Sequence, residues 1–359
     1  MADVYKQTEL EIPNLHKALN VVRHIVKPLL TILLLIFSIF LYGQSTEEFG
    51  FRHLQTIYKG DTVDILIKSK KGEEHIKKPL LLFCQGSLPI PLIIKYDENG
   101  NKGIYNVFVF NTDSLSKEYH LAIINKPFVP LIADKNSLSN DLTFADSVGN
   151  YSTDYTKRNL LDYYVDRDIR VIKFLQKQNF ISSTRLVVAG HSEGSAIAAN
   201  IAYKYKKVTE LIYAGGSPLG RIMTIIERAR NEQLKDTARN VNGIFEYWGT
   251  TVENKNNDIS TGDTFKGQYQ FSCPPPIEIL LKLNIPVLVT YGTKDFGAVA
   301  QNDYLRIATI ANQKKNFTFK DYIGVDHNFF PLLQNDKPDY EKFNWDKVAE
   351  DWRAWLKKK

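Results

Sequence analysis

Residues 185–202 read RLVVAGHSEGSAIAANIA, and this stretch decides how the chain folds. Its first part, residues 185–189, is dominated by apolar side chains, as a buried strand is. Its last part, residues 196–202, is rich in alanine, and such small side chains suit a helix that lies close against a sheet. Gly190-His191-Ser192-Glu193-Gly194 stands between the two parts. The stretch therefore predicts a strand, a tight turn and a helix in succession.

The turn has a serine between two glycines, at the spacing Gly-x-Ser-x-Gly. A turn this tight strains the backbone of the serine. The positions two before and two after it need glycine, because a Cβ atom there would collide with the neighbouring strand and helix. The hydroxyl of Ser192 is then held out above the sheet. In these residues the chain resembles the α/β-hydrolase superfamily, and the resemblance covers roughly residues 50–359.

Segments with strand and helix character alternate along this region, which favours a layered α/β domain. Residues 54–58 and 62–68 flank Gly60-Asp61, a hairpin signal, so we expect the first strands to be antiparallel. The fold class we expect is α/β: an α/β-hydrolase fold with a mostly parallel central sheet, antiparallel N-terminal strands, helices on both faces and a cap insertion. Further strands are expected at residues 80–84, 105–110, 120–125, 185–189, 211–214, 285–291 and 317–323. Helices are expected from residue 161, after Ser192 and after Asn344. The helix after Asn344 has an apolar stripe formed by Trp345, Val348, Trp352 and Leu356.

One connection in this pattern is far longer than the others. Residues 218–284 separate two expected strands, whereas α/β connections usually take about 2 to 6 residues. Residues 222–234 have the pattern of a helix, and Phe245-Glu246-Tyr247-Trp248 is an aromatic cluster. We expect a cap or lid over the edge of the sheet where the strands end, the edge at which open α/β sheets bind ligands. The alternative is a solvated loop without a role in function.

The N-terminal region has the layout of a signal peptide. Residues 29–41 are apolar apart from Thr31 and Ser38, and basic residues precede them. The run is shorter than the ~20 residues that span a bilayer as a helix. We expect residues 1–45 to be a leader ahead of a hydrolase domain at residues 46–359, and the protein to be exported, periplasmic or secreted. One alternative is an uncleaved signal-anchor, which would supply the one membrane contact. The other alternative is a buried core helix.

The composition excludes several classes of partner and cofactor. The net charge is +6, but basic residues are interleaved with acids along the chain, so we expect no nucleic-acid partner. Two cysteines, Cys84 and Cys273, exclude a disulfide-rich scaffold and a cysteine-based zinc cluster, and leave either one bridge or two packed thiols. The sequence has no phosphate-binding loop, dinucleotide fingerprint or His-Glu-x-x-His motif, so we expect no cofactor and no metal.

The resemblance implies that Ser192 is a nucleophile, and a serine hydroxyl needs a base to accept its proton. In this superfamily the order along the chain is serine, acid, histidine. Of the seven histidines, five precede the serine, and His191 lies inside the turn, where we expect its side chain to point away from Ser192. His327 remains, in a polar loop just after the last expected strand, and we assign it as the base.

The acid of such a triad usually follows the penultimate strand, and here that strand runs into Gly292-Thr293-Lys294-Asp295. We therefore assign Asp295. Asp326 is an alternative, but it neighbours His327 in sequence and reaches its Nδ1 atom poorly. Asp258 and Asp263, both within the insertion, are alternatives if the acid follows the preceding strand.

The resemblance also implies two backbone amides that bind the oxyanion. We assign the N–H of Glu193 and the N–H of Ser87, with Gly86 as the alternative to Ser87. Gln85 stands where relatives commonly have histidine, and we count it with Tyr247 and Trp248 as a candidate substrate-binding residue. The side chain of Glu193 is expected either to contact substrate or to interact with the N-terminus of its helix.

Together these residues predict a serine hydrolase that cleaves an ester or another acyl bond of a small-molecule substrate through an acyl-enzyme. A serine peptidase or aminopeptidase of the same fold is one alternative, and Glu227, Glu232 and Glu246 are the acids available to bind a substrate ammonium group. A non-catalytic binding module of the same fold is the other alternative, but such modules usually lose a triad member.

Overall fold

The computed structural model describes residues 46–98, 100–106 and 108–359. The chain divides into two compact units, Met1–Phe49 and Gly50–Lys359. In the first unit the described part is a short 3-10 helix, η1 (Thr46–Phe49), and the predicted leader at residues 1–45 lies outside the described residues. Within the described part of the chain, none of the helices has both the length and the apolar character that crossing a membrane requires.

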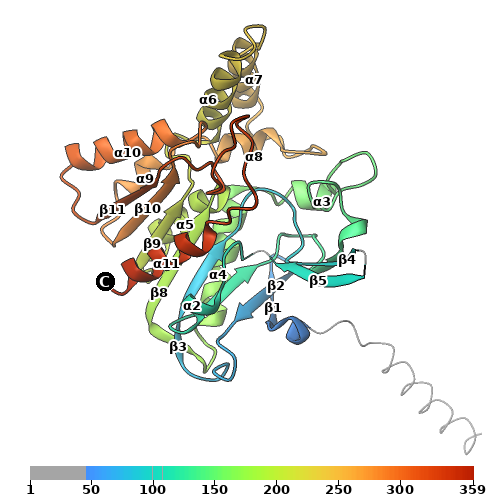
Figure 1. Cartoon of the computed structure of the whole chain (residues 1–359), viewed down its shortest axis with the longest axis vertical. Helices are drawn as coiled ribbons and strands as arrows, with labels where there is room; N and C mark the ends of the chain where they lie inside the picture. Colours follow the sequence, from blue (N-terminus) through green and yellow to red (C-terminus); the bar gives the residue numbers. More distant parts are fainter. Residues whose placement is uncertain (1–45, 99, 107) are drawn as a thin grey trace, which may run out of the picture. The chain divides into compact units, whose positions relative to one another are not determined.

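The second unit contains an eight-stranded sheet (Figure 1). Six strands of this sheet run parallel to one another, namely β6, β3, β8, β9, β10 and β11, whereas β1 is antiparallel to β2 and β2 is antiparallel to β6. The predicted, mostly parallel sheet with antiparallel N-terminal strands is therefore confirmed. In spatial order the strands are β1 (Arg52–Tyr58), β2 (Asp61–Lys68), β6 (His120–Ile124), β3 (Lys78–Cys84), β8 (Ile181–His191), β9 (Glu210–Ala214), β10 (Val287–Gly292) and β11 (Phe317–Tyr322).

A two-residue turn joins the first two strands. Tyr58 pairs with Asp61, and Lys59 and Gly60 between them have φ angles of 51° and 87°. Two successive residues with positive φ form the kind of turn whose twist matches that of a hairpin. The predicted antiparallel opening arises from this local geometry.

Helices cover both faces of the sheet. Leu80 and Leu82 of β3 belong to a core formed with α4 (Leu161–Leu175) and α5 (Glu193–Lys204). Phe83 points to the opposite face, as alternation along a strand requires, and its ring lies 6.4 Å from that of Trp352 on α11 (Trp345–Leu356). All four members of the predicted α11 stripe are buried. Asn344 occupies the N-cap position of α11, although its side chain makes no capping hydrogen bond.

The predicted strand at residues 105–110 is wrong. Strand β5 (Asn101–Asn106) ends earlier and pairs with β4 (Ile93–Glu98), which also pairs with β7 (Ile132–Asp134), so these three strands form a separate small sheet. Phe110 instead packs its ring 5.5 Å from those of Phe83 and Trp352. The apolar character of this segment therefore reflects an aromatic cluster beneath α11.

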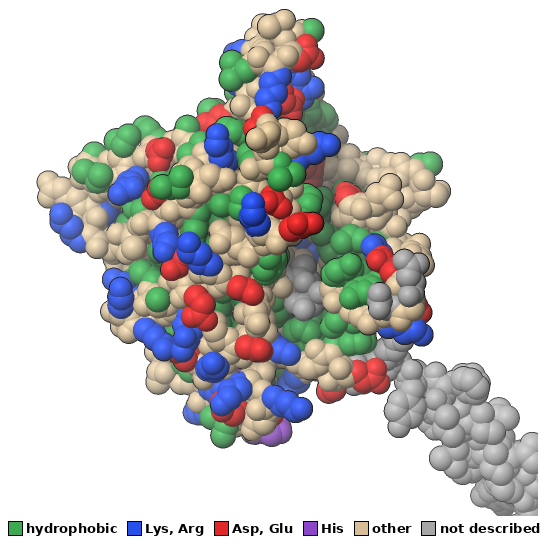
Figure 2. Space-filling view, in the orientation of Figure 1, with side chains coloured by type: hydrophobic (Ala, Val, Ile, Leu, Met, Phe, Trp, Pro, Cys, Tyr) green, Lys and Arg blue, Asp and Glu red, His purple; other side chains and the backbone are tan. Residues whose placement is uncertain are grey.

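The long connection between β9 and β10 is largely helical. It contains a helix at the predicted position, and a small core of Ile222, Ile226, Ala229 and Val241 lies between the first two helices. These two helices extend beyond the ends of the strands, at the top of Figure 1. On the face in Figure 2, blue and red side chains are interspersed rather than grouped by sign. The helices are α6 (Arg221–Gln233), α7 (Asn242–Glu253), α8 (Phe265–Gln270) and α9 (Ile277–Leu280).

Candidate active site

The predicted tight turn joins β8 to α5. Ser192 has φ 58° and ψ −127°, a backbone conformation that is unfavourable for any residue with a side chain. A Cβ atom on Gly190 would lie 2.0 Å from the carbonyl oxygen of Gly194, and one on Gly194 would lie 2.0 Å from that of Cys84. Both glycines are therefore required, because backbone atoms fill the space that a side chain needs.

The loops after β10 and β11 bring an acid to a histidine. Nδ1 of His327 lies 2.7 Å from Oδ2 of Asp295, whose side chain is 2% exposed. Burial by itself raises the pKa of Asp295, but the hydrogen bond from His327 and nearby positive charge, including Arg228, outweigh burial and hold this pKa below its usual value. Since the carboxylate accepts, Nδ1 carries the proton, and Nε2 is left to accept one from a nucleophile.

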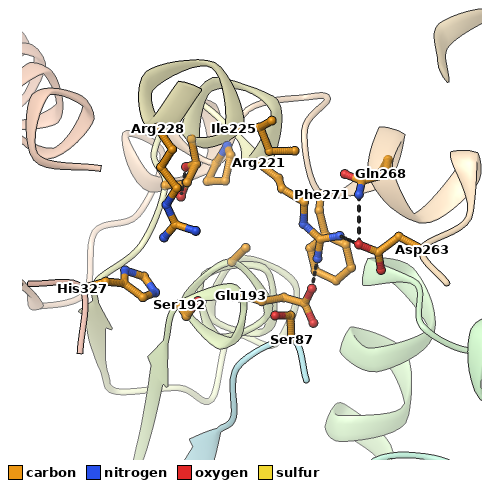
Figure 3. A pocket seen from close by; sticks show the side chains of 14 residues that line it. Ser87, Ser192, Glu193, Arg221, Ile225, Arg228, Asp263, Gln268, Phe271 and His327 are labelled. Atoms are coloured by element: carbon orange, nitrogen blue, oxygen red, sulfur yellow. Dashed lines mark hydrogen bonds and ion pairs between the residues drawn. The ribbon is translucent and has the colours of Figure 1, made fainter. Parts of the chain in front are cut away.

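Ser192 and His327 line the same cavity, which has a volume of about 250 Å³. Figure 3 shows the imidazole beside Ser192, with α6 on the opposite wall. A second cavity of about 370 Å³ is also lined by Ser192 and His327, together with Gln85 and Gly86. The structure thus places Ser192 and His327 on the walls of the same two cavities, with Asp295 hydrogen-bonded to the imidazole.

The other candidate acids are engaged elsewhere. Oδ1 of Asp326 accepts hydrogen bonds from the backbone N–H groups of Asn328 and Phe330, at 2.9 and 2.8 Å. Asp263 forms an ion pair with Arg221 at 3.2 Å, and Asp258 lies 3.8 Å from Lys266. Asp295 is the predicted acid that the structure pairs with His327.

Both residues predicted to supply oxyanion donors, Glu193 and Ser87, line the cavity that Ser192 also lines. Glu193 is the first residue of α5, so its N–H has no acceptor within the helix. A Cβ atom on Gly86 would lie 3.7 Å from Cβ of Ser192, so the loop after β3 passes beside the serine. The carbonyl of Ser87 in this loop accepts hydrogen bonds from Nζ of Lys126 at 3.2 Å and the hydroxyl of Tyr155 at 3.1 Å. These contacts fix the loop's orientation toward the site.

The side chain of Glu193 is buried between two cations. Its carboxylate lies 3.2 Å from Nζ of Lys126 and also forms an ion pair with Arg221. Arg221 in turn lies over the ring of Phe271, at 4.4 Å from its centroid. Burial, together with Arg167 and Arg221 nearby, lowers the pKa of Lys126 to about 7. The two roles expected for this carboxylate, contact with substrate or with the N-terminus of its helix, do not include these ion pairs. The two cations come from distant segments that carry no motif.

His191 and Ser192 both line the second cavity, and His191 holds the loop that carries His327. Its Nε2–H donates to the backbone carbonyl of His327 at 2.9 Å, and its ring packs edge-on against Trp345 with centroids 4.9 Å apart. Burial and the proximity of His327 lower the pKa of His191 to about 3. His191 is therefore neutral near pH 7, and it links the serine turn to the histidine loop.

This buried histidine is expected to make the fold sensitive to acid. Its folded-state pKa of about 3 lies below the ordinary value of 6.5, so the unfolded chain binds one more proton between these pH values. The free energy of unfolding should therefore fall by up to about 3 to 5 kcal/mol as the pH drops from about 6.5 to about 3. Urea unfolding across this range should show a shallower fall for His191→Gln, which keeps an N–H donor but does not titrate. Identical pH dependences would contradict this role.

The structure does not bring Tyr247 and Trp248 to the site. The ring of Trp248 stacks on that of Tyr269 with centroids 6.0 Å apart, and the ring of Tyr247 lies 6.1 Å from that of Phe265. These aromatic side chains of α7 pack against the segment around α8 instead of lining either cavity at Ser192. The aromatic residue that lines the first cavity is Phe271, a single residue in a region without a motif.

Gln85 lines the second cavity, and its side-chain amide donates to the carbonyl of Ile124 at 2.8 Å. Both cysteines are free thiols, and Cys84 is buried, so the structure has no bridge between Cys84 and Cys273. Among residues 46–359, leaving aside 99 and 107, no three His, Cys, Asp or Glu side chains are grouped so that they could hold a metal ion.

No family model matches this chain, and a search of the curated proteins finds no significant match. Solved structures do match. The acylaminoacyl peptidase of Pyrococcus horikoshii is similar with a TM-score of 0.50 at 14% identity, over 84% of this chain and 41% of that one. A putative dipeptidyl aminopeptidase IV from Bacteroides ovatus has a TM-score of 0.50 at 10% identity, over 84% and 35%. Est1E from Butyrivibrio proteoclasticus has a TM-score of 0.49 at 16% identity, over 85% and 100%.

This chain spans about two fifths of the length of the Pyrococcus peptidase. The likeness covers 84% of this chain, and at this level of identity it concerns the fold. The order of strands, the tight turn at Ser192 and the two structures with a TM-score of 0.50 agree. The chain has the fold of the α/β-hydrolase superfamily.

Proposed function

We propose that this protein is a serine hydrolase that cleaves an ester or a related acyl bond of a small molecule. The observation that carries the proposal is the hydrogen bond of 2.7 Å between His327 and Asp295, on the same cavity as Ser192. A binding module without activity would have no need for all three groups, and the part of the chain that the structure describes keeps all three.

In the proposed reaction, Oγ of Ser192 attacks the carbonyl carbon of the substrate and passes its proton to Nε2 of His327. Asp295 stabilises the imidazolium that forms. The N–H groups of Glu193 and Ser87 bind the oxyanion of the tetrahedral intermediate. The leaving group then departs with the proton from His327, and water, activated by the same histidine, hydrolyses the acyl-enzyme.

The state of the acids near the site favours an ester over a peptide with a free amino terminus. Such a peptide needs an unpaired carboxylate to bind its ammonium group. Glu193 already has two cationic partners, Lys126 and Arg221, and Asp263 is paired with Arg221. Of the three acids considered from the sequence, Glu232 pairs with Arg239 at 3.0 Å and Glu227 accepts from Gln301 at 3.1 Å, and neither they nor Glu246 line the two cavities at Ser192. Esters and N-acylated substrates do not need this charge.

The location we propose, exported or anchored in a membrane, rests on residues 29–41 alone. We also propose that α6 to α9 act as a cap, since α6 forms one wall of the cavity at Ser192. We expect neither a nucleic-acid partner nor a cofactor to be required for the reaction.

A substrate panel tests the proposed class. The full chain would be assayed with p-nitrophenyl esters of several acyl lengths and with alanine p-nitroanilide, both free and N-acetylated. We expect turnover of the esters and no turnover of the anilide that has a free amino group. Faster hydrolysis of that anilide than of the esters would indicate an aminopeptidase. Absence of turnover on the whole panel, with no covalent labelling of Ser192, would indicate a binding module.

A further inference from the structure

Helix α6 presents one face to the cavity at Ser192. Arg221, Thr224, Ile225 and Arg228 of this helix all line the cavity, and their spacing of three and four residues places them on the same side of the helix. In Figure 3 the guanidinium group of Arg228 points into the cavity on the same side as His327, whereas Arg221 lies farther along the wall. Two arginines therefore face the space above the serine.

The two arginines differ in how their charge is balanced. Arg221 has two carboxylate partners, Glu193 and Asp263. For Arg228, no carboxylate within the described ranges lies at ion-pair distance, 4.0 Å or less, and none of its nitrogens makes a hydrogen bond to another described residue. The face of α6 thus carries one neutralised arginine and one whose charge is available.

Acids that line a cavity with Arg228, or that neighbour it along the chain, are already engaged. Asp295 is paired with His327, Glu227 accepts from Gln301, and Glu232 is paired with Arg239. Arg228 itself lines both cavities that flank Ser192, the one of about 250 Å³ and the one of about 370 Å³. A substrate placed with its carbonyl at Ser192 therefore extends past Arg228 on either side of the bond to be cleaved.

A planar guanidinium with free N–H groups matches a carboxylate, which it can bind through two parallel hydrogen bonds. We propose that Arg228 binds a carboxylate on the substrate, so that the preferred substrates are acyl esters that carry an acidic group close to the scissile bond. Ile225 and Phe271, on the walls of the first cavity, supply apolar contacts for the carbon chain between the two groups. This inference rests on the proposed hydrolase function of the site.

The acidic group can belong to the acyl part or to the leaving group, and a pair of substrates tests each case. Monoethyl glutarate carries the carboxylate on the acyl side, and ethyl 5-methylhexanoate is its neutral counterpart. 4-Butyryloxybenzoate carries the carboxylate on the leaving group, and 4-butyryloxybenzamide is its neutral counterpart. The quantity measured is the ratio of kcat/KM for the acidic member to kcat/KM for the neutral member of each pair.

We expect the wild-type ratio to favour the acidic ester in at least one pair. In Arg228→Gln that ratio should fall by about 10- to 100-fold, the effect of losing hydrogen bonds to a charged group. Arg228→Lys should recover part of it, because lysine keeps the charge without the two parallel donors. Arg230→Gln is the matched control: Arg230 is exposed on the same helix and bonds to Gln233, so this variant should leave both ratios unchanged.

The alternative role for Arg228 is to support the Asp295 carboxylate. In that case Arg228→Gln would slow the acidic and the neutral esters equally, the ratio would not move, and the inference would be overturned. An unchanged ratio with unchanged rates would overturn it as well. If the neutral esters are hydrolysed in these experiments, the proposed hydrolase function stands even when the inference about Arg228 is overturned. Absence of turnover on all four esters, with no labelling of Ser192, would instead overturn the function on which this inference rests.

Discussion

Ser192→Ala is expected to lower kcat/KM on the best ester substrate by at least about 10⁴-fold. Without the hydroxyl, no acyl-enzyme forms, and the oxyanion donors and substrate binding are the only catalytic contributions left. The change keeps the Cβ atom at a residue with φ 58°, so it leaves the backbone of the turn as it is. Steady-state kinetics should therefore show the loss while the melting temperature stays within about 2 °C of the wild type, because the side chain of Ser192 lines a cavity and is not part of the packed core.

Ser183→Ala provides the control for this prediction. Ser183 is exposed on the same strand, β8, at the end far from the turn. Its loss should leave kcat/KM unchanged. A Ser192→Ala protein that retained more than about one hundredth of the wild-type activity would mean that another group is the nucleophile.

Gly194→Ala is expected to prevent folding or to lower the free energy of unfolding by more than about 3 kcal/mol, at the upper end of what overpacking costs. The new Cβ atom would lie 2.0 Å from the carbonyl oxygen of Cys84 and 2.6 Å from that of Gln85. Both are backbone atoms at the end of β3 and the start of the predicted oxyanion loop, so no side chain can rotate to make room. Any protein that does fold should be inactive, because Ser87 shifts with this loop.

Gly249→Ala is the matched control for the glycine. Gly249 lies inside α7, and a Cβ atom there would meet nothing within 4 Å. Alanine in a helix interior is expected to raise the free energy of unfolding by about 0.5 to 1 kcal/mol. Urea unfolding of both variants checks the pair. Equal stability of Gly194→Ala and the wild type would show that the turn is looser than its geometry implies.

The sequence predicts the tight turn at Ser192 because its motif lies within five consecutive residues. The spacing of Gly190, Ser192 and Gly194 permits the turn, because a Cβ atom on either glycine would collide with backbone atoms. Asp295 and His327 each follow a strand, and the carboxyl ends of parallel strands meet at one edge of the sheet. A correct order of strands is therefore enough to predict that these side chains meet.

The surroundings of the site could not be predicted in the same way. Lys126 and Arg221 meet at Glu193 from segments far apart in the chain, and nothing in either segment marks the meeting point. Within the insertion, the apolar pattern predicts the helix that became α6 but not which face it turns to the serine. The sequence therefore does not show that Arg228 on α6 lines the cavity at Ser192, or that Trp248 on α7 packs against Tyr269 instead.

The most direct test of this account is to identify the residue that a fluorophosphonate probe modifies. The probe reacts with a serine only when a nearby base activates the hydroxyl. After labelling of the full chain and proteolysis, mass spectrometry should find the adduct on Ser192, with labelling strongly slowed in His327→Ala and in Asp295→Asn. An adduct on a different residue, or labelling of Ser192 at the wild-type rate in both variants, would contradict the account.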